Sequence, residues 1–253
     1  MSDENGSVRS GPWDLEELRR TVEAHFGEER ANHCWKSLQS IVERQSFAGY
    51  HFREYLRLIA VRFPAGRTHE EELITMFTNE DQALRNLRVE QEAAAHVVAC
   101  MQSIHSVNDT LAHIIFWALA PMWPRLEQLG EHGVDLPRLG GVLSDGPLTV
   151  EMNAMINTLI EHPDMVYLSD VVNHGKHRRI VGPKITVDVD SDGLAKPVLE
   201  IESFQHVTRA VTRIYDARAV DSFLNIVYGL QSQTVVSIGR SIRPLILAKR
   251  FGQ

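Results

Sequence analysis

The chain has 253 residues, of which 43% are hydrophobic and 23% charged, and its formal net charge at pH 7 is −7. These proportions are typical of a globular protein and exclude an intrinsically disordered chain, a collagen and a small disulfide scaffold. The charge is uneven, because residues 101–170 carry a net −7 whereas residues 205–253 carry a net +5. An acidic chain of this kind can still present a local basic surface to a nucleic acid.

Cysteine content and hydropathy indicate the compartment. Cys34 and Cys100 form no CxxC motif and are too few for a disulfide framework, which favours a reducing environment. The polar N-terminus has no apolar segment of the signal-peptide kind. No apolar run reaches the ~20 residues that a membrane-spanning helix needs. We therefore expect a cytoplasmic protein with no membrane contact.

Helical spacing dominates the first half of the chain. Residues 1–12 are expected to be a disordered lead, and residues 13–128 an N-terminal helical part. Asp14 is the expected N-cap of the first helix, with Glu17 three positions later. Apolar positions three and four residues apart predict helices over residues 15–26, 28–44, 50–63, 81–104 and 111–119.

The Gly/Pro-rich segment 129–147 is expected to be a loop and a candidate subdomain junction. Residues 148–253 form the second helical part, in which Pro163 occupies a favoured first-turn position. Its expected helices cover residues 148–161, 164–173 and about 216–249.

Between the last two helices the apolar pattern changes to strict alternation. The turn sequence Asp190-Ser-Asp-Gly separates two such alternating runs, which predicts a β-hairpin over about 180–204. The fold class expected from the sequence is therefore mainly α: a helical bundle with one β-hairpin insert before a long C-terminal helix, the two helical parts packing as one domain.

The segment 170–179, Asp-Val-Val-Asn-His-Gly-Lys-His-Arg-Arg, has the residue types of a phosphate site. If the preceding helix continues through Gly175, then Asn173 and His177 lie one turn apart on one face. A histidine oriented by an amide can move a proton, and nearby cations can stabilise a phosphate. The expected catalytic residues are His177, Asn173 and Lys176; the expected nucleic-acid contacts are His174, Arg178 and Arg179.

Other interpretations of the same residues stay open. Lys, Arg and His are favoured at any helix C-terminus, so the segment is also consistent with a helix end that has no function. His174 and His177 form an H-x-x-H pair, but no further His or Cys cluster completes a site, so we expect no metal and no cofactor. His105, Asp109 and His113 recur every fourth residue, and either face a cleft or are solvated.

The sequence YLSDVVNHGKHRRIV, with its Asn-x-x-Lys-His pattern, resembles uncharacterised bacterial members of the HEPN superfamily. The resemblance also takes in residues 103–112, the hairpin and the final helix. It implies a helical bundle, metal-independent ribonuclease activity in a toxin–antitoxin, defence or stress system, and an active site built across a homodimer. The usual motif of that superfamily has an Arg before the His, but positions 170–172 are Asp, Val and Val.

Two functions therefore remain. The first is an RNA-directed protein, a metal-independent endoribonuclease with RNA as its partner. The second is a non-catalytic helical protein that mediates homodimer or other protein contacts through its acidic front and basic tail. The missing Arg favours the second function, and the cluster at residues 170–179 favours the first.

Overall fold

The computed structural model describes residues 13–64, 66, 68–143, 149–189, 195–208 and 210–249. The described helices are α1 (Leu15–Phe26), α2 (Glu28–Arg62), α3 (His69–Thr78), α4 (Glu80–Leu119), α5 (Pro124–Glu127), α6 (Leu136–Leu143), α7 (Val150–Glu161), α8 (Pro163–His177) and α9 (Val220–Lys249). The described strands are β1 (Pro183–Val189), β2 (Ala195–Ile201), β3 (Phe204–Val207), β4 (Thr212–Tyr215) and β5 (Arg218–Ala219). The expected mainly α fold is confirmed. The expected lead at residues 1–12 lies outside the described residues.

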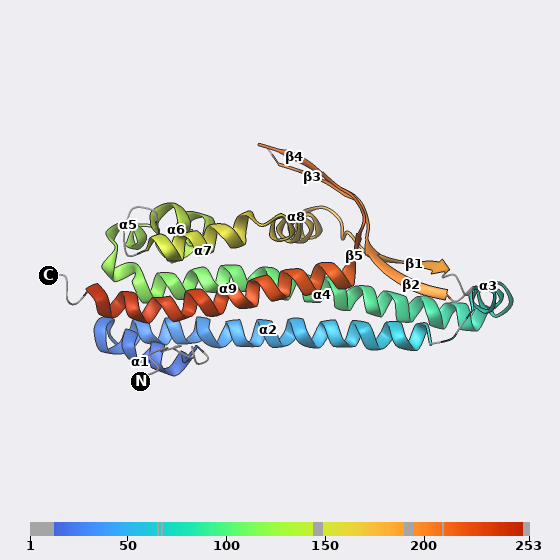
Figure 1. Ribbon diagram of the computed structural model, residues 1–253, viewed down its shortest axis with the longest axis horizontal. Helices are drawn as coiled ribbons and strands as arrows, with labels where there is room; N and C mark the ends of the chain where they lie inside the picture. Colours follow the sequence, from blue (N-terminus) through green and yellow to red (C-terminus); the bar gives the residue numbers. More distant parts are fainter. Residues whose placement is uncertain are drawn as a thin grey trace, which may run out of the picture.

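Two long antiparallel helices, α2 and α4, form the spine of an elongated molecule (Figure 1). Helix α9 lies along one half of this pair, with α1 on the outer side of α2 and α5–α8 on the opposite side of the molecule. The other half of the α2–α4 pair extends past α9 and ends at α3. We call this extended half the arm. It comprises residues 56–62, α3 and residues 80–92, which lie beyond the contact of Tyr55 with Asp221 in the first turn of α9.

The sequence predicts two shorter helices in place of each of α2 and α4, and both of these predictions are wrong. Helix α2 runs through Gly49, although a helical glycine costs about 1 kcal/mol relative to alanine. Helix α4 runs through Asn108 and Asp109, either of which has the side chain of an N-cap for the second helix expected there. The Asn108 side chain is used instead in a tertiary contact, since its Oδ1 accepts a hydrogen bond from Gln231 Nε2 of α9 at 2.7 Å.

Local signals placed other helix ends correctly. The Asp14 carboxylate accepts a hydrogen bond from the Glu17 amide at 2.8 Å, which confirms the expected cap of α1. Pro163 occupies the first turn of α8, as expected. The expected loop over 129–147 is wrong for its middle, because residues 136–143 form α6 with Leu136, Leu139 and Leu143 buried. Burial of this apolar face outweighs the helix-breaking tendency of Gly140 and Gly141.

The predicted hairpin is confirmed as β1 paired antiparallel with β2, in a register that sets Pro183 opposite Ile201; its turn at residues 190–194 lies outside the described residues. Strand β5 adds to β2 to complete a three-stranded sheet. The sequence did not predict the second antiparallel hairpin, β3–β4. This hairpin packs against α8.

Buried apolar side chains from α1 to α9 form one hydrophobic cluster, which extends from Leu18 to Ile246. It includes both cysteines as free thiols. None of the described helices combines the length and the apolar character that crossing a membrane requires.

Candidate functional site

Helix α8 continues through Gly175 to His177, and the Arg178 amide caps it by donating to the His174 carbonyl at 2.9 Å. This extension meets the condition under which Asn173 and His177 lie one turn apart. The six expected site residues are nevertheless divided among three environments. Asn173 and Lys176 line a cavity, His174 is buried, and His177, Arg178 and Arg179 are exposed at the helix end.

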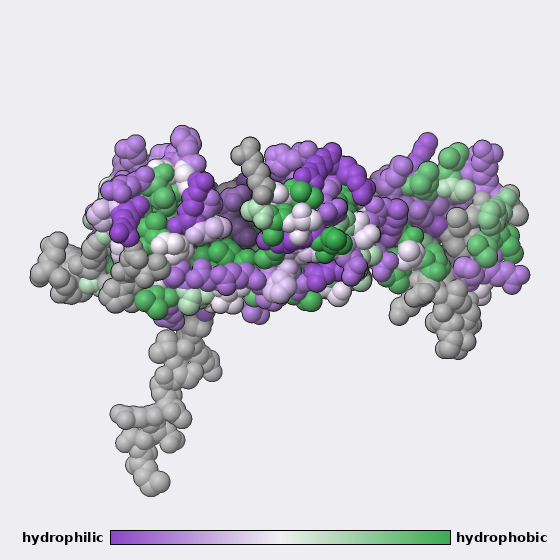
Figure 2. Space-filling model, turned by 90° about the horizontal axis from the view of Figure 1, so that it is seen from above, coloured by the Kyte–Doolittle hydropathy of each residue, from purple (hydrophilic) through white to green (hydrophobic). Residues whose placement is uncertain are grey.

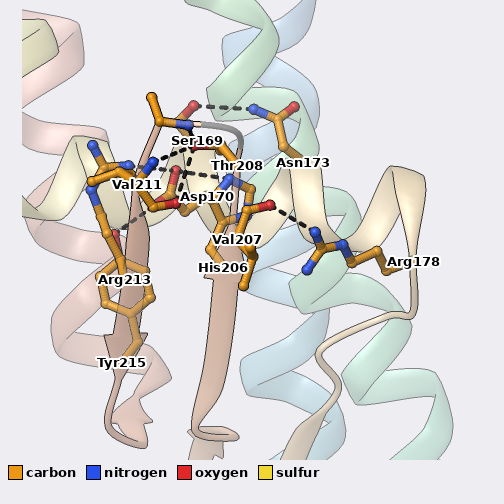
Figure 3. Close-up of polar contacts among 11 residues, drawn as sticks. Ser169, Asp170, Asn173, Arg178, His206, Val207, Thr208, Val211, Arg213 and Tyr215 are labelled. Atoms are coloured by element: carbon orange, nitrogen blue, oxygen red, sulfur yellow. Dashed lines mark hydrogen bonds and ion pairs between the residues drawn. The ribbon is translucent and has the colours of Figure 1, made fainter.

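The exposed arginines are engaged with the β structure. Arg178 Nη2 donates to the Val207 carbonyl at 2.7 Å (Figure 3). Arg179 Nη1 lies 3.5 Å from Glu202 Oε2, and the other oxygen of Glu202 is 2.5 Å from Lys184 Nζ. These contacts connect the C-terminus of α8 to the strands. They support the structural interpretation of both arginines more than the expected nucleic-acid role.

His174 packs its ring against Phe204 of β3, with ring centroids 5.5 Å apart. Burial lowers its pKa, and the charges of Arg178 and Arg179 lower it further. A buried neutral imidazole in this position serves packing between α8 and the second hairpin. It is not placed to contact a phosphate backbone in solvent.

Asp170 holds the second hairpin to α8 (Figure 3). Its carboxylate accepts a hydrogen bond from the Tyr215 hydroxyl at 2.6 Å and lies 3.0 Å from Arg213 Nη1 and 3.6 Å from His206 Nε2. The Asn173 amide donates to the Ser169 hydroxyl at 3.3 Å, and no hydrogen bond joins it to His177 among the described residues. The expected orientation of His177 by Asn173 is therefore not found in this structure.

A polar cavity of about 440 Å³ lies between α4, α6, α7 and α8. We call it the polar cavity. From α8 it receives Ser169, Asn173 and Lys176, and from α4 it receives His105, Asn108 and Asp109. Figure 2 shows a recess with hydrophilic residues at its floor, between the part of the molecule that carries α5–α7 and the part that carries α8.

His105 contributes a titratable imidazole to the wall of the polar cavity. Burial lowers its pKa, the positive charge of Lys176 lowers it further, and the negative charge of Asp109 acts in the opposite direction. Its Nδ1 is screened from solvent and has no hydrogen-bond partner among the described residues. At neutral pH the imidazole is therefore uncharged and able to accept a proton.

The Asn108 side chain is oriented by a hydrogen bond from α9. Gln231, 1% exposed, donates from Nε2 both to the Ile104 carbonyl and to Asn108 Oδ1, each at 2.7 Å. This leaves the amide N–H groups of Asn108 free to donate into the cavity. A cation, two amides and a neutral imidazole at one cavity can hold a phosphate and move a proton.

Both halves of this site carry a signal in the sequence, but no sequence pattern joins them. The spacing of His105 and Asp109 indicated a shared helix face, and Asn173 and Lys176 belonged to the expected catalytic set. Asp135 at the cavity wall gave no recognisable signal. No group of three or more His, Cys, Asp or Glu residues in the described ranges is arranged to hold a metal ion.

Comparison of the chain with protein-family models, with curated proteins and with solved structures found no match.

Proposed function

We propose that this protein is RNA-directed and that the polar cavity is its ribonuclease site. The observation that carries the proposal is the convergence of His105 and Asp109 of α4 with Asn173 and Lys176 of α8 on one cavity. A volume of about 440 Å³ lies within the range of small-molecule sites and accommodates a single nucleotide.

In the proposed reaction, neutral His105 accepts the proton of a ribose 2′-hydroxyl. The 2′-oxygen then forms a bond to phosphorus, and the bond from phosphorus to the 5′-oxygen breaks. That oxygen leaves with a proton from solvent, and the other fragment ends in a 2′,3′-cyclic phosphate. Lys176 stabilises the charge that develops on the phosphate, and the amides of Asn108 and Asn173 orient it.

The HEPN resemblance supports the same class of activity, because it implies metal-independent cleavage of RNA. The proposal moves the acid–base role from the exposed His177 to the more buried His105. His177, Arg178 and Arg179 are exposed outside the lining of the cavity and stay candidates for RNA contacts, and the choice between His105 and His177 is open to direct test.

The test is cleavage of end-labelled RNA by purified protein in the presence of EDTA. We expect His105→Gln and Lys176→Met to lower the cleavage rate at least a hundredfold, as the loss of a general base or a charge-stabilising group does. His113→Gln, two turns further along α4, is the matched control and should cleave like the wild type. Replacing the target 2′-hydroxyl by hydrogen should block cleavage.

Variant His177→Gln separates the two assignments of the general base. Full activity of this variant together with an inactive His105→Gln supports the polar cavity. Loss of activity only in His177→Gln, or no cleavage and no RNA binding by the wild type, contradicts the proposal.

A second candidate function is homo-oligomerisation without catalysis, which the exposed apolar side chains of the arm and its neighbourhood favour. Phe47 is 55% exposed, Val61 61% and Phe77 83%. Large apolar side chains exposed on one part of a molecule are typical of protein contact sites. We propose a homodimer, with other protein partners as the alternative. Sedimentation of the wild type beside Phe47→Ser and Phe77→Ser tests the homodimer, which these substitutions should weaken. A wild type that is monomeric at micromolar concentration refutes it.

A further inference from the structure

A second cavity, of about 240 Å³, lies between α2, α4 and α9. We call it the apolar cavity. It shares no lining residue with the polar cavity, and its walls are mainly apolar. They include Ala48 and Phe52 of α2, Cys100 and Ile104 of α4, and Leu224 of α9. An open space with such walls favours the apolar part of a ligand.

One cation lies at this cavity. Arg53 lines it from α2, and a Cβ atom added to Gly49 would lie 3.4 Å from the Arg53 Nη1. The guanidinium therefore lies over Gly49, one turn earlier in α2, where a larger side chain would compete with it for space. Asn225 and Tyr228 of α9 also line the cavity and supply further hydrogen-bonding groups.

The acids next to Arg53 are occupied elsewhere. Glu54 Oε2 accepts from Arg57 Nε at 2.8 Å, and the Asp221 carboxylate accepts from the Tyr55 hydroxyl. Among the described residues no carboxylate forms an ion pair with Arg53. A free guanidinium beside an apolar space has the charge and geometry to accept a carboxylate in a bidentate pair.

The remaining polar group in the wall carries no charge that competes with Arg53. The Cys100 thiol donates to the Ala48 carbonyl at 3.4 Å, and burial raises its pKa to about 12. It stays protonated at neutral pH and behaves as a small apolar group.

We propose that the apolar cavity binds an unbranched medium-chain monocarboxylate, with its alkyl chain inside and its carboxylate on Arg53. The space of about 240 Å³ corresponds to roughly eight groups of the size of a water molecule, ~30 Å³ each. This volume fits an acid of about eight carbons, whose two oxygens remain at the mouth. The ligand class follows from an apolar volume and a cation, Arg53, that has no ion pair within the described part of the chain, and it is independent of the proposed ribonuclease site.

Isothermal titration of the full chain with sodium octanoate tests the proposal. We expect one molecule bound per chain, with a negative heat-capacity change because apolar surface is buried. Octan-1-ol, which has the same chain without the charge, should bind at least tenfold more weakly. Arg53→Gln should weaken octanoate binding about tenfold, in line with the loss of one charge-assisted interaction.

Arg57→Gln is the matched control, because it removes a charge one turn further along α2 that already pairs with Glu54. It should bind octanoate like the wild type. Gly49→Leu places a side chain beside Arg53 and should abolish binding while the helical circular dichroism signal is kept. Absence of octanoate binding by the wild type, equal binding of octan-1-ol, or unchanged binding by Arg53→Gln would each overturn the proposal.

Discussion

The anchoring of the β3–β4 hairpin by Asp170 leads to a sharp prediction for Asp170→Asn. A two-stranded hairpin is marginally stable by itself in water, so its order depends on its attachment to α8. The substitution keeps the size of the side chain and removes its charge. It weakens the 2.6 Å hydrogen bond from the Tyr215 hydroxyl and the contacts with Arg213 and His206.

The magnitude follows from the exposure of each partner. A hydrogen bond to a buried carboxylate contributes about 1.5–3 kcal/mol, and asparagine keeps part of it. Arg213 is 42% exposed, so solvent screening limits its ion pair to about 1 kcal/mol or less. We therefore expect a loss of about 2 kcal/mol in the free energy of hairpin opening, which corresponds to roughly thirtyfold faster exchange of its backbone amides.

Native-state hydrogen exchange measures this effect segment by segment. Amides of β3 and β4 should exchange faster in Asp170→Asn, while those of α2 and α4 should not change. Asp216→Asn is the control, because Asp216 is exposed next to Tyr215 and has no ion pair among the described residues. Unchanged exchange in the hairpin, or equal acceleration by Asp216→Asn, would refute the anchoring role.

The same variant has a second readout in the titration of Tyr215. Burial raises the pKa of this phenol to about 12, and the hydrogen bond and charge of Asp170 contribute to the rise. Asp170→Asn removes these two contributions, so the pKa should fall toward the ordinary value of 10.0. Ultraviolet difference titration against Tyr215→Phe isolates the signal, and an unchanged pKa would contradict the contact.

Three further predictions concern other parts of the molecule. A Cβ atom at Gly239 would lie 2.3 Å from the Trp13 ring. Gly239→Ala should therefore lower the melting temperature by several degrees, even though alanine favours helices, and a stabilised variant would contradict this packing. Burial raises the pKa of both Cys34 and Cys100 to about 12, so neither thiol should react with a disulfide reagent at pH 8 until the chain unfolds, and fast labelling of the native protein would be inconsistent with this. Burial lowers the folded-state pKa of His174 below 6.5, so the packing of its neutral ring contributes to stability above that pH and this contribution is lost as the pH falls. His174→Phe should therefore make the free energy of unfolding less sensitive to acid, and an identical pH profile of denaturant unfolding would contradict this expectation.

The elements that were predicted correctly have signals within a few residues. Asp14 and Glu17 define the start of α1, Pro163 marks the first turn of α8, and alternation around a turn sequence defines the β1–β2 hairpin. Each of these signals acts through the local backbone. A single sequence is therefore sufficient to detect them.

The elements that were missed depend on contacts between distant residues. Asn108 has the side chain of a helix cap, but its partner Gln231 lies 123 residues away and keeps it inside α4. The strands β3 and β4 have four residues each, and their anchor, Asp170, belongs to a helix. Local propensity is weak compared with such tertiary contacts.

In the candidate site, too, the local spacing can be predicted from the sequence and the long-range packing cannot. The spacing of His105 and Asp109 on α4, and of Asn173 and Lys176 on α8, is visible in the sequence as two separate pairs. Their meeting at one cavity depends on how α8 packs against α4. The emphasis on His177 came from its spacing from Asn173 and from the Asn-x-x-Lys-His pattern, whereas His105 lines the cavity and has a pKa lowered by burial.

The position of α9 along one half of α4 has a consequence for synthesis on the ribosome. Helices α2 and α4 are separated only by α3, so this pair can zip together soon after residue 119 leaves the exit tunnel. The C-terminal half of α4, with the buried side chains Ile104, Leu111 and Ile115, packs against α9, which ends at residue 249. At 5–20 residues per second, α9 is completed roughly 7–26 s after α4, and these side chains lack their partner during that time. The nascent chain therefore presents a long apolar helix face to chaperones, and truncations before α9 should aggregate.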